Sequence, residues 1–163
     1  MRFRTQFWLL LILVGLLMQV VAAENISKTN DGVVLAVNLK AAGEQARQKK
    51  IPLMIFFAAE ECEFCERLEA DYLSAMANSD AYRQRVLIRK VVIDSYDDFL
   101  DFSGKDIEAD VFSDKYNIQV TPTLVFVDHK GVSIARRIIG YNASGFFGAE
   151  LDELIDAASA GLR

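Results

Sequence analysis

Cys62 and Cys65 are the residues of this chain whose type and spacing could do chemistry. They are its only cysteines, and they form a Cys-x-x-Cys motif around Glu63 and Phe64. Two thiols this close can form and open a disulfide, and such pairs exchange disulfides through a mixed-disulfide intermediate. A disulfide across so small a loop would add little stability, because loop-closure stabilisation grows with loop length. The pair is therefore interpreted as chemically active rather than as a structural cross-link.

Other uses of the motif are weighed against this interpretation. A structural zinc site needs four ligands, and Cys62, Cys65 and His129 are the only Cys and His residues, so zinc would require ligands shared across a dimer. A c-type haem site needs His directly after the second cysteine, where this chain has Glu66. Two inert core cysteines remain an alternative. We expect no metal site.

The segments on either side of the motif predict how the two thiols differ. Residues 53–58 are a continuous apolar run, which indicates a strand buried on both faces, and a helix is expected to begin at Cys62. The positive end of the helix dipole would stabilise the Cys62 thiolate and hold its pKa below the free value of about 8.5. Cys65 would lie one turn further along and be shielded. The predicted nucleophile is Cys62, and the predicted resolving thiol is Cys65.

The remaining segments predict an α/β fold with a central mixed sheet flanked by helices on both faces. Residues 35–50 have the spacing of a helix that Pro52 ends, and the helix at the motif is expected to bury Cys65, Leu68, Tyr72, Ala75 and Met76. Gly131 is expected in a hairpin turn with positive φ. Further strands are expected over 86–94, 123–127 and 132–139, and further helices over 110–116 and 146–158.

The first residues have the pattern of a secretory signal peptide. Residues 1–4 are basic, an apolar run follows from Phe7, and small residues precede Glu24. We expect residues 1–23 to be a signal cleaved after Ala23, which would place the protein in the periplasm. The alternative is an uncleaved segment that anchors it to the inner membrane. Residues 24–34 are expected to be a polar leader, and residues 35–163 one domain.

Composition and charge narrow the possible partners. The chain has 163 residues, 52% of them hydrophobic, and its 18 Lys and Arg against 23 Asp and Glu give a net charge of −5. This apolar content excludes a disordered chain. The acidic balance argues against nucleic-acid binding, because an acidic surface repels phosphates. We expect a monomer whose partners are proteins.

Several separated motifs together resemble the thioredoxin superfamily. They are FFAAEECEFCERLEADYL, VVID, YNIQVTPTLVFVDHKG and IIGY, within residues 35–160. The chain is most similar to exported thioredoxin-like proteins, such as the SoxW-type thioredoxins and the thiol:disulfide interchange proteins. The resemblance implies a thioredoxin-like fold, Cys62 as nucleophile, Cys65 as resolving thiol and Pro122 as a cis-proline facing the pair. It also implies that Thr121 contacts substrate. A trans-proline before a strand is the alternative for Pro122.

The chain departs from that family at several positions. Glu61 stands where the family usually has Trp, and Phe56 stands where thioredoxin has a buried acid that assists proton transfer. Lys90 matches a lysine that lies near this acid in thioredoxin, and the alternative is a solvated charge at a strand end. An insertion near residues 95–113 would either form a specificity loop or cover a sheet edge.

Acidic residues crowd the motif and bear on its direction of reaction. Negative charge near Cys62 disfavours its thiolate, and therefore favours a reducing pair over an oxidising one. The favoured function is an exported thiol:disulfide oxidoreductase that reduces protein disulfides. A disulfide oxidase or isomerase, and a non-catalytic binding module of the same fold, are alternatives. No flavin or nicotinamide fingerprint is present, so we expect no cofactor and a membrane-embedded thiol reductase as electron donor. The acids involved are Glu60, Glu61, Glu63 and Glu66.

Overall fold

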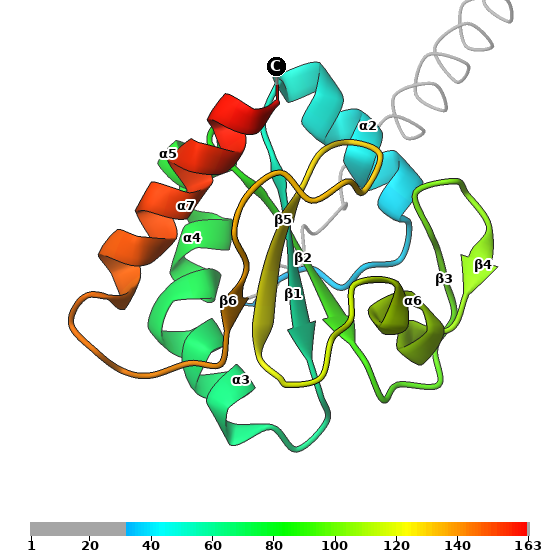
Figure 1. Ribbon diagram of the computed structural model, residues 1–163, viewed down its shortest axis with the longest axis horizontal. Helices are drawn as coiled ribbons and strands as arrows, with labels where there is room; N and C mark the ends of the chain where they lie inside the picture. The colour runs from blue at the N-terminus through cyan, green and yellow to red at the C-terminus, as the bar shows by residue number, and fades with distance from the viewer. Residues whose placement is uncertain (1–31, 163) are drawn as a thin grey trace, which may run out of the picture.

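A four-stranded mixed sheet lies at the centre of the molecule (Figure 1). The computed structural model describes residues 32–162, so the expected signal peptide and most of the leader lie outside the described residues. The strand order is β2-β1-β5-β6, with β1 parallel to β2 and both other pairs antiparallel. The strands are β1 (Leu53–Ala58), β2 (Leu87–Val92), β5 (Thr123–Val127) and β6 (Ile138–Ile139), with β3 (Phe99–Leu100) and β4 (Asp106–Ile107) in a separate hairpin.

Helices cover both faces of this sheet, as the sequence predicted. In Figure 1, α3, α4 and α7 lie on one side of the strands, and α2 and α6 lie on the other. The helices are α2 (Leu39–Lys49), α3 (Glu63–Leu68), a π-helical turn η1 (Glu69–Leu73), α4 (Ser74–Asn78), α5 (Asp80–Arg83), α6 (Ala109–Lys115) and α7 (Phe147–Gly161).

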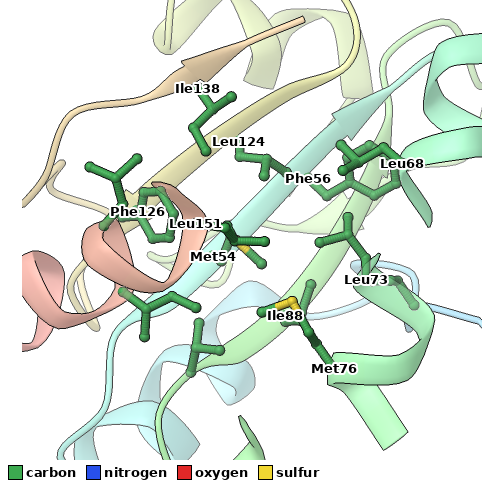
Figure 2. Packing of buried hydrophobic residues seen from close by; sticks show 14 of the residues in the cluster. Met54, Phe56, Leu68, Leu73, Met76, Ile88, Leu124, Phe126, Ile138 and Leu151 are labelled. Atoms are coloured by element: carbon green, nitrogen blue, oxygen red, sulfur yellow. The ribbon is translucent and has the colours of Figure 1, made fainter. Parts of the chain in front are cut away.

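Strand β1 supplies side chains to two separate hydrophobic cores. Met54 and Phe56 belong to the core under α3, α4 and α7, where they pack with side chains such as Leu68 and Leu151 (Figure 2). Successive side chains of a strand point to opposite faces, so Leu53, Ile55 and Phe57 belong to the core under α2 and α6. Every residue of β1 is buried, which confirms the prediction from its continuous apolar run.

The first described helix begins later than the sequence predicted. Helix α2 starts at Leu39, and Asn38 caps it by accepting a hydrogen bond from the Ala41 N–H at 2.8 Å. Residues 35–37 are not helical, because Leu35 pairs with Lys90 at the edge of the sheet and the Ala36 N–H donates to the Lys90 carbonyl. The Asn at position 38 is the signal that could have located this start.

The helix that carries the motif contains a π-helical turn, which changes the face it buries. Segments α3, η1 and α4 form one continuous helix over residues 63–78. The π-turn adds one residue to a turn, so the buried positions run from Leu68 to Leu73 and then to Met76. The prediction was wrong for Ala75, which is exposed, and Tyr72 is only half-buried.

The predicted strand over 132–139 was wrong for most of its length. Only Ile138 and Ile139 form a strand, and Ser133 makes a single bridge to Val127. The two arginines between them have partners outside the sheet: Arg136 pairs with Glu150 on α7, and Arg137 donates to the Tyr116 carbonyl. Between Ser133 and Ile138, therefore, contacts of the two arginines take the place of the continuous strand pairing that the alternation of apolar and polar residues favoured.

The insertion near residues 95–113 contributes to the second core. Phe99 and Phe112 are buried, and their rings meet edge to face with centroids 5.1 Å apart. Phe102 also packs against this core, and Leu100 is bridged to Asn38 ahead of α2. Tyr96 is fully exposed. The aromatic residues of the insertion therefore serve packing, and Tyr96 is the exception that remains free to contact another molecule.

Candidate redox site

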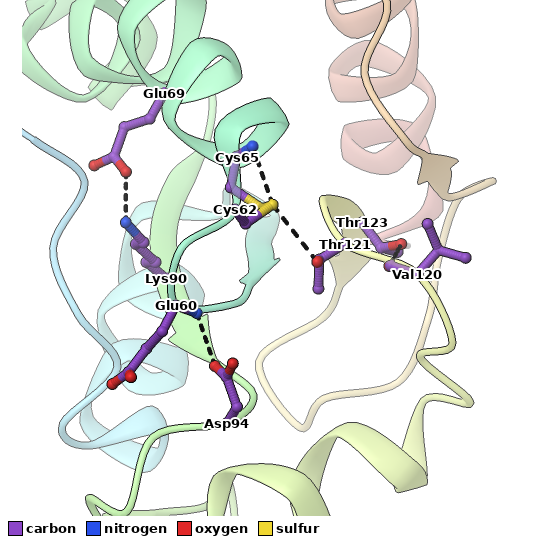
Figure 3. The surroundings of a disulfide bond; sticks show 9 residues. All are labelled: Glu60, Cys62, Cys65, Glu69, Lys90, Asp94, Val120, Thr121 and Thr123. Carbon is purple, nitrogen blue, oxygen red and sulfur yellow. Dashed lines mark hydrogen bonds and ion pairs between the residues drawn. A yellow bond between two sulfur atoms is a disulfide. The ribbon is translucent and has the colours of Figure 1, made fainter.

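A disulfide joins Cys62 and Cys65 where β1 leads into α3 (Figure 3). Cys62 is the N-cap residue of α3, and its sulfur accepts a hydrogen bond from the Cys65 N–H at 3.2 Å. Cys65 lies in the first turn and is 2% exposed, whereas Cys62 is half-buried. The difference in burial is compatible with the predicted roles, because an attacking sulfur must be reached by another protein's disulfide, whereas a resolving sulfur has to reach only Cys62.

The loop before β5 faces the disulfide. The Thr121–Pro122 peptide bond is cis, which confirms what the resemblance implied for Pro122. The Thr121 hydroxyl donates to the Cys62 sulfur at 3.6 Å, and Figure 3 shows Thr121 facing Cys62 on the side opposite Lys90 and Glu69. The four residues predicted for the site, Cys62, Cys65, Thr121 and Pro122, therefore come from two segments that the sheet brings together. Their catalytic and binding roles remain predictions.

Hydrogen bonds on both sides fix the position of the motif. The Glu60 N–H donates to Asp94 Oδ1 at 2.8 Å, which ties the loop before Cys62 to the end of β2. On the other side, the Tyr141 hydroxyl donates to Asp71 Oδ2 at 2.5 Å. This hydrogen bond to a carboxylate, together with burial, raises the pKa of Tyr141 to about 12. The hydrogen bond between Tyr141 and Asp71 joins the helix that carries the cysteines to the segment just after β6.

Two electrostatic influences on the Cys62 sulfur oppose each other. The helix N-terminus and the Cys65 N–H favour negative charge on Cys62. The carboxylates crowded around the motif disfavour it, although water screens them because their side chains are exposed. These exposed acids are Glu60, Glu61, Glu63 and Glu66.

Lys90 is neither next to an acid on β1 nor a solvated charge. Its neighbour across the sheet is Phe56, which is completely buried, and its ammonium group lies 5.5 Å from the centre of that ring. Instead, Lys90 Nζ donates to Glu69 Oε2 at 2.6 Å (Figure 3). Glu69 is a site residue that the sequence did not indicate. Its only sequence signal is its place four residues after Cys65, and nothing local pairs it with Lys90.

A cavity of about 450 Å³ opens beside Cys65. Its wall includes Cys65, Lys90 and Phe99, together with Leu35 and Val37 from the segment before α2. The cavity is therefore lined by the buried Cys65, the half-buried Lys90 and residues of the insertion. It lies beside Cys65, whereas the cis-proline loop meets the motif at Cys62.

Two further features concern membranes and metal ions. Within residues 32–162, no helix combines the length and hydropathy needed to cross a membrane. Over the same residues, no group of three or more His, Cys, Asp or Glu side chains is arranged to hold a metal ion.

Comparisons with known proteins agree with this architecture. A family model for a thioredoxin-like domain matches residues 39–155. The structure is similar to a poplar thioredoxin h mutant, with 20% identity, a TM-score of 0.55 and coverage of 83% of this chain and 89% of that one. It is also similar to mitochondrial thioredoxin 3 from Saccharomyces cerevisiae in its oxidized form, with 22% identity, a TM-score of 0.51 and coverage of 76% and 94%.

A third solved structure gives the same result. Thioredoxin O2 from Arabidopsis thaliana, in its oxidized state, has 21% identity and a TM-score of 0.51, with coverage of 76% of this chain and 91% of that one. Similarity at this level of identity concerns the fold alone. A search of curated proteins found no match.

Proposed function

The chain belongs to the thioredoxin-like domain family, and on this premise we propose that it is a thiol:disulfide oxidoreductase that reduces disulfides in other proteins. The observation that carries the proposal is the placement of the Cys62–Cys65 disulfide at a helix N-terminus, with the Thr121 hydroxyl 3.6 Å from the Cys62 sulfur. Attack on another protein's disulfide needs one sulfur that this disulfide can reach, and resolution needs a second thiol beside it; Cys62 and Cys65 meet these two needs.

The reaction follows from the two positions. In the reduced protein, the Cys62 thiolate attacks one sulfur of a substrate disulfide, which forms a Cys62–substrate bond and releases the other substrate sulfur as a thiolate that takes up a proton. The Cys65 thiol then loses its proton and its sulfur attacks Cys62. The Cys62–Cys65 bond forms, the mixed disulfide breaks, and the second substrate sulfur leaves and is protonated. Two electrons have passed from the cysteine pair to the substrate.

The reducing direction is favoured over an oxidase or isomerase by the charges around the motif. A strong oxidant requires a stabilised reduced form, which a favourable environment for the thiolate provides. Here four exposed glutamates lie near the motif and oppose the contribution of the helix N-terminus. The same glutamates favour substrates with basic residues near their disulfide.

Export and the source of electrons belong to the same proposal. The signal pattern in residues 1–23 supports a periplasmic protein, with an uncleaved inner-membrane anchor as the alternative. In an exported reductase without a redox cofactor of its own, electrons must come from another protein, and a membrane-embedded thiol reductase is the class that fits. This would place the chain with exported thioredoxin-like proteins of the SoxW type.

Reduction of insulin disulfides in the presence of dithiothreitol tests the proposal. We expect the full-length chain to accelerate insulin precipitation, and Cys62→Ser to abolish the acceleration. A chain without activity, or a Cys62→Ser variant as active as the parent, would contradict a thiol mechanism and favour a binding module. Cys65→Ser should accumulate a mixed disulfide with its substrate, so the trapped protein identifies what the site reduces.

A further inference from the structure

Glu69 and Lys90 form the most enclosed ion pair in the described part of the chain. Their side chains are 17% and 23% exposed, and Lys90 Nζ lies 2.6 Å from Glu69 Oε2. In every other ion pair within residues 32–162, at least one side chain is more than a third exposed. Removing charges from water is costly, so an enclosed pair is weak evidence for added stability.

The position of this pair relates it to Cys65. Glu69 is four residues after Cys65 on the same helix, a spacing that places two side chains on one face with about 5–6 Å between their Cβ atoms. The Glu69 N–H also donates to the Cys65 carbonyl. Lys90 lines the cavity beside Cys65, and Figure 3 shows Glu69 and Lys90 on the side of Cys65 away from the cis-proline loop.

Glu69 is held in place from two directions. Its Oε2 accepts from Lys90, and its Oε1 accepts from the Val33 N–H at 2.9 Å. Val33 is 7% exposed and packs in the same core as Cys65. Phe56, under the lysine, brings no ionisable group of its own. The carboxylate is therefore fixed where the segment before α2, the helix and β2 meet.

We propose that Glu69 and Lys90 are positioning residues that together set the proton affinity of the Cys65 thiol, an inference that rests on Cys65 acting as the resolving thiol of the proposed function. Cys65 must lose a proton to attack the mixed disulfide. The ammonium group of Lys90 favours the resulting thiolate, and the carboxylate of Glu69 opposes it. As a closed pair they offset one another, so neither form of the thiol is strongly favoured.

Other charged groups near Cys65 are more exposed to water. The cavity wall also carries carboxylates from the loop before Cys62, from α3 and from the insertion, and all of them are exposed. Water screens such charges, whereas the enclosed pair is screened much less. Loss of either member of the Glu69–Lys90 pair should therefore change the proton affinity of Cys65 more than loss of any one of these exposed carboxylates. These exposed carboxylates are Glu60, Glu61, Glu66, Asp97 and Asp98.

Breaking the pair from either side gives opposite predictions. Lys90→Met leaves the Glu69 carboxylate unpaired, which should raise the pKa of the Cys65 thiol. Glu69→Gln leaves the Lys90 ammonium unpaired, which should lower that pKa. An unpaired charge beside a thiol shifts its pKa by about one unit, so the ratio of thiolate to thiol at a fixed pH should change by about tenfold each way. The double variant should return towards the parent.

The test is a titration of Cys65 as the only thiol. In a full-length Cys62→Ser background, with a phosphine reductant present, thiolate absorbance at 240 nm is followed from pH 5 to pH 11. Lys90→Met, Glu69→Gln and the double variant are compared with the parent. Glu44→Gln is the matched control, because Glu44 pairs with Arg47 on the surface of α2, and this variant should leave the Cys65 titration unchanged.

Each outcome decides between charge control and a merely structural role. Opposite shifts that cancel in the double variant support the proposal. No shift, or shifts of the same sign that add in the double variant, would overturn it. The insulin assay on the parent separates the two claims: an active parent with unshifted titrations refutes only the role of the pair, whereas an inactive parent refutes the proposed function whatever the titrations show.

Discussion

Replacing Thr121 with Val should make Cys62 a weaker nucleophile at neutral pH. Valine keeps the branched shape of threonine and removes only the hydroxyl that donates to the Cys62 sulfur at 3.6 Å. In the reduced protein this donor stabilises the thiolate, so its loss raises the pKa of Cys62. Thr121 is half-buried, so the substitution itself should leave the loop intact.

The expected rise in the pKa of Cys62 follows from the free energy that one hydrogen bond contributes. A hydrogen bond of this kind contributes about 1 kcal/mol net, and one pKa unit corresponds to about 1.36 kcal/mol. The pKa of Cys62 should therefore rise by about 0.7 unit, and the ratio of thiolate to thiol at pH 7 should fall about fivefold.

Alkylation of the reduced protein by iodoacetamide measures this directly. The rate follows the thiolate, so its midpoint on the pH axis reports the pKa of Cys62. Thr123→Val is the matched control: the hydroxyl of Thr123, the first residue of β5, donates to the Val120 carbonyl at 2.7 Å and not to the Cys62 sulfur. The control should lose stability and keep the midpoint. An unchanged midpoint in Thr121→Val, or an equal shift in both variants, would refute the reasoning.

Three further predictions concern stability. Phe112→Ala should cost about 3–5 kcal/mol in urea denaturation, because a ring that is 2% exposed leaves a cavity, yet the reduction potential should not change. Gly43→Ala, usually stabilising within a helix, should instead cost about 1–3 kcal/mol, because its Cβ would lie 2.4 Å from the His129 carbonyl oxygen; a higher melting temperature would contradict this. Tyr141→Phe should cost about 1–2 kcal/mol at pH 8 through the lost bond to Asp71. The raised pKa of Tyr141 means that this contribution is complete below pH 10 and is lost as the pH approaches about 12, so the difference between variant and parent in urea denaturation should shrink at pH 11; a constant difference would oppose it.

Much of the fold could be predicted because its central strands have unambiguous patterns. The apolar runs of β1 and β5 can be buried only on both faces of a sheet, and both strands match the prediction in position. The Cys-x-x-Cys motif and Pro122 lie next to these strands, so the predicted site residues came together once the strands were placed. For β1, β5 and the motifs beside them, the local sequence pattern favours the same structure as the packing of the whole sheet.

The errors arose where distant partners decide the local structure. The π-turn after Leu68 has no local signal, and it shifts the buried face of the helix by one residue. Apolar and polar residues alternate before Ile138 as they do in a strand. In the structure, however, Arg136 pairs with Glu150 on α7, and Arg137 donates to the Tyr116 carbonyl at the end of α6.

The ion pair beside Cys65 was missed for the same reason. Glu69 and Lys90 are 21 residues apart and belong to a helix and a strand, so only the folded sheet brings them together. A sequence can show that Phe56 replaces a buried acid, but it cannot show where another carboxylate will lie.

The equilibrium reduction potential of the Cys62–Cys65 pair tests the central claim most directly. The full-length chain is titrated against a dithiothreitol or glutathione couple, and the oxidised fraction is followed by thiol labelling. We predict a reversible two-electron couple near the potential of thioredoxin, about −270 mV. A value near about −120 mV, that of a strong periplasmic oxidant, would contradict the reducing direction, and the absence of a reversible disulfide would contradict the oxidoreductase itself.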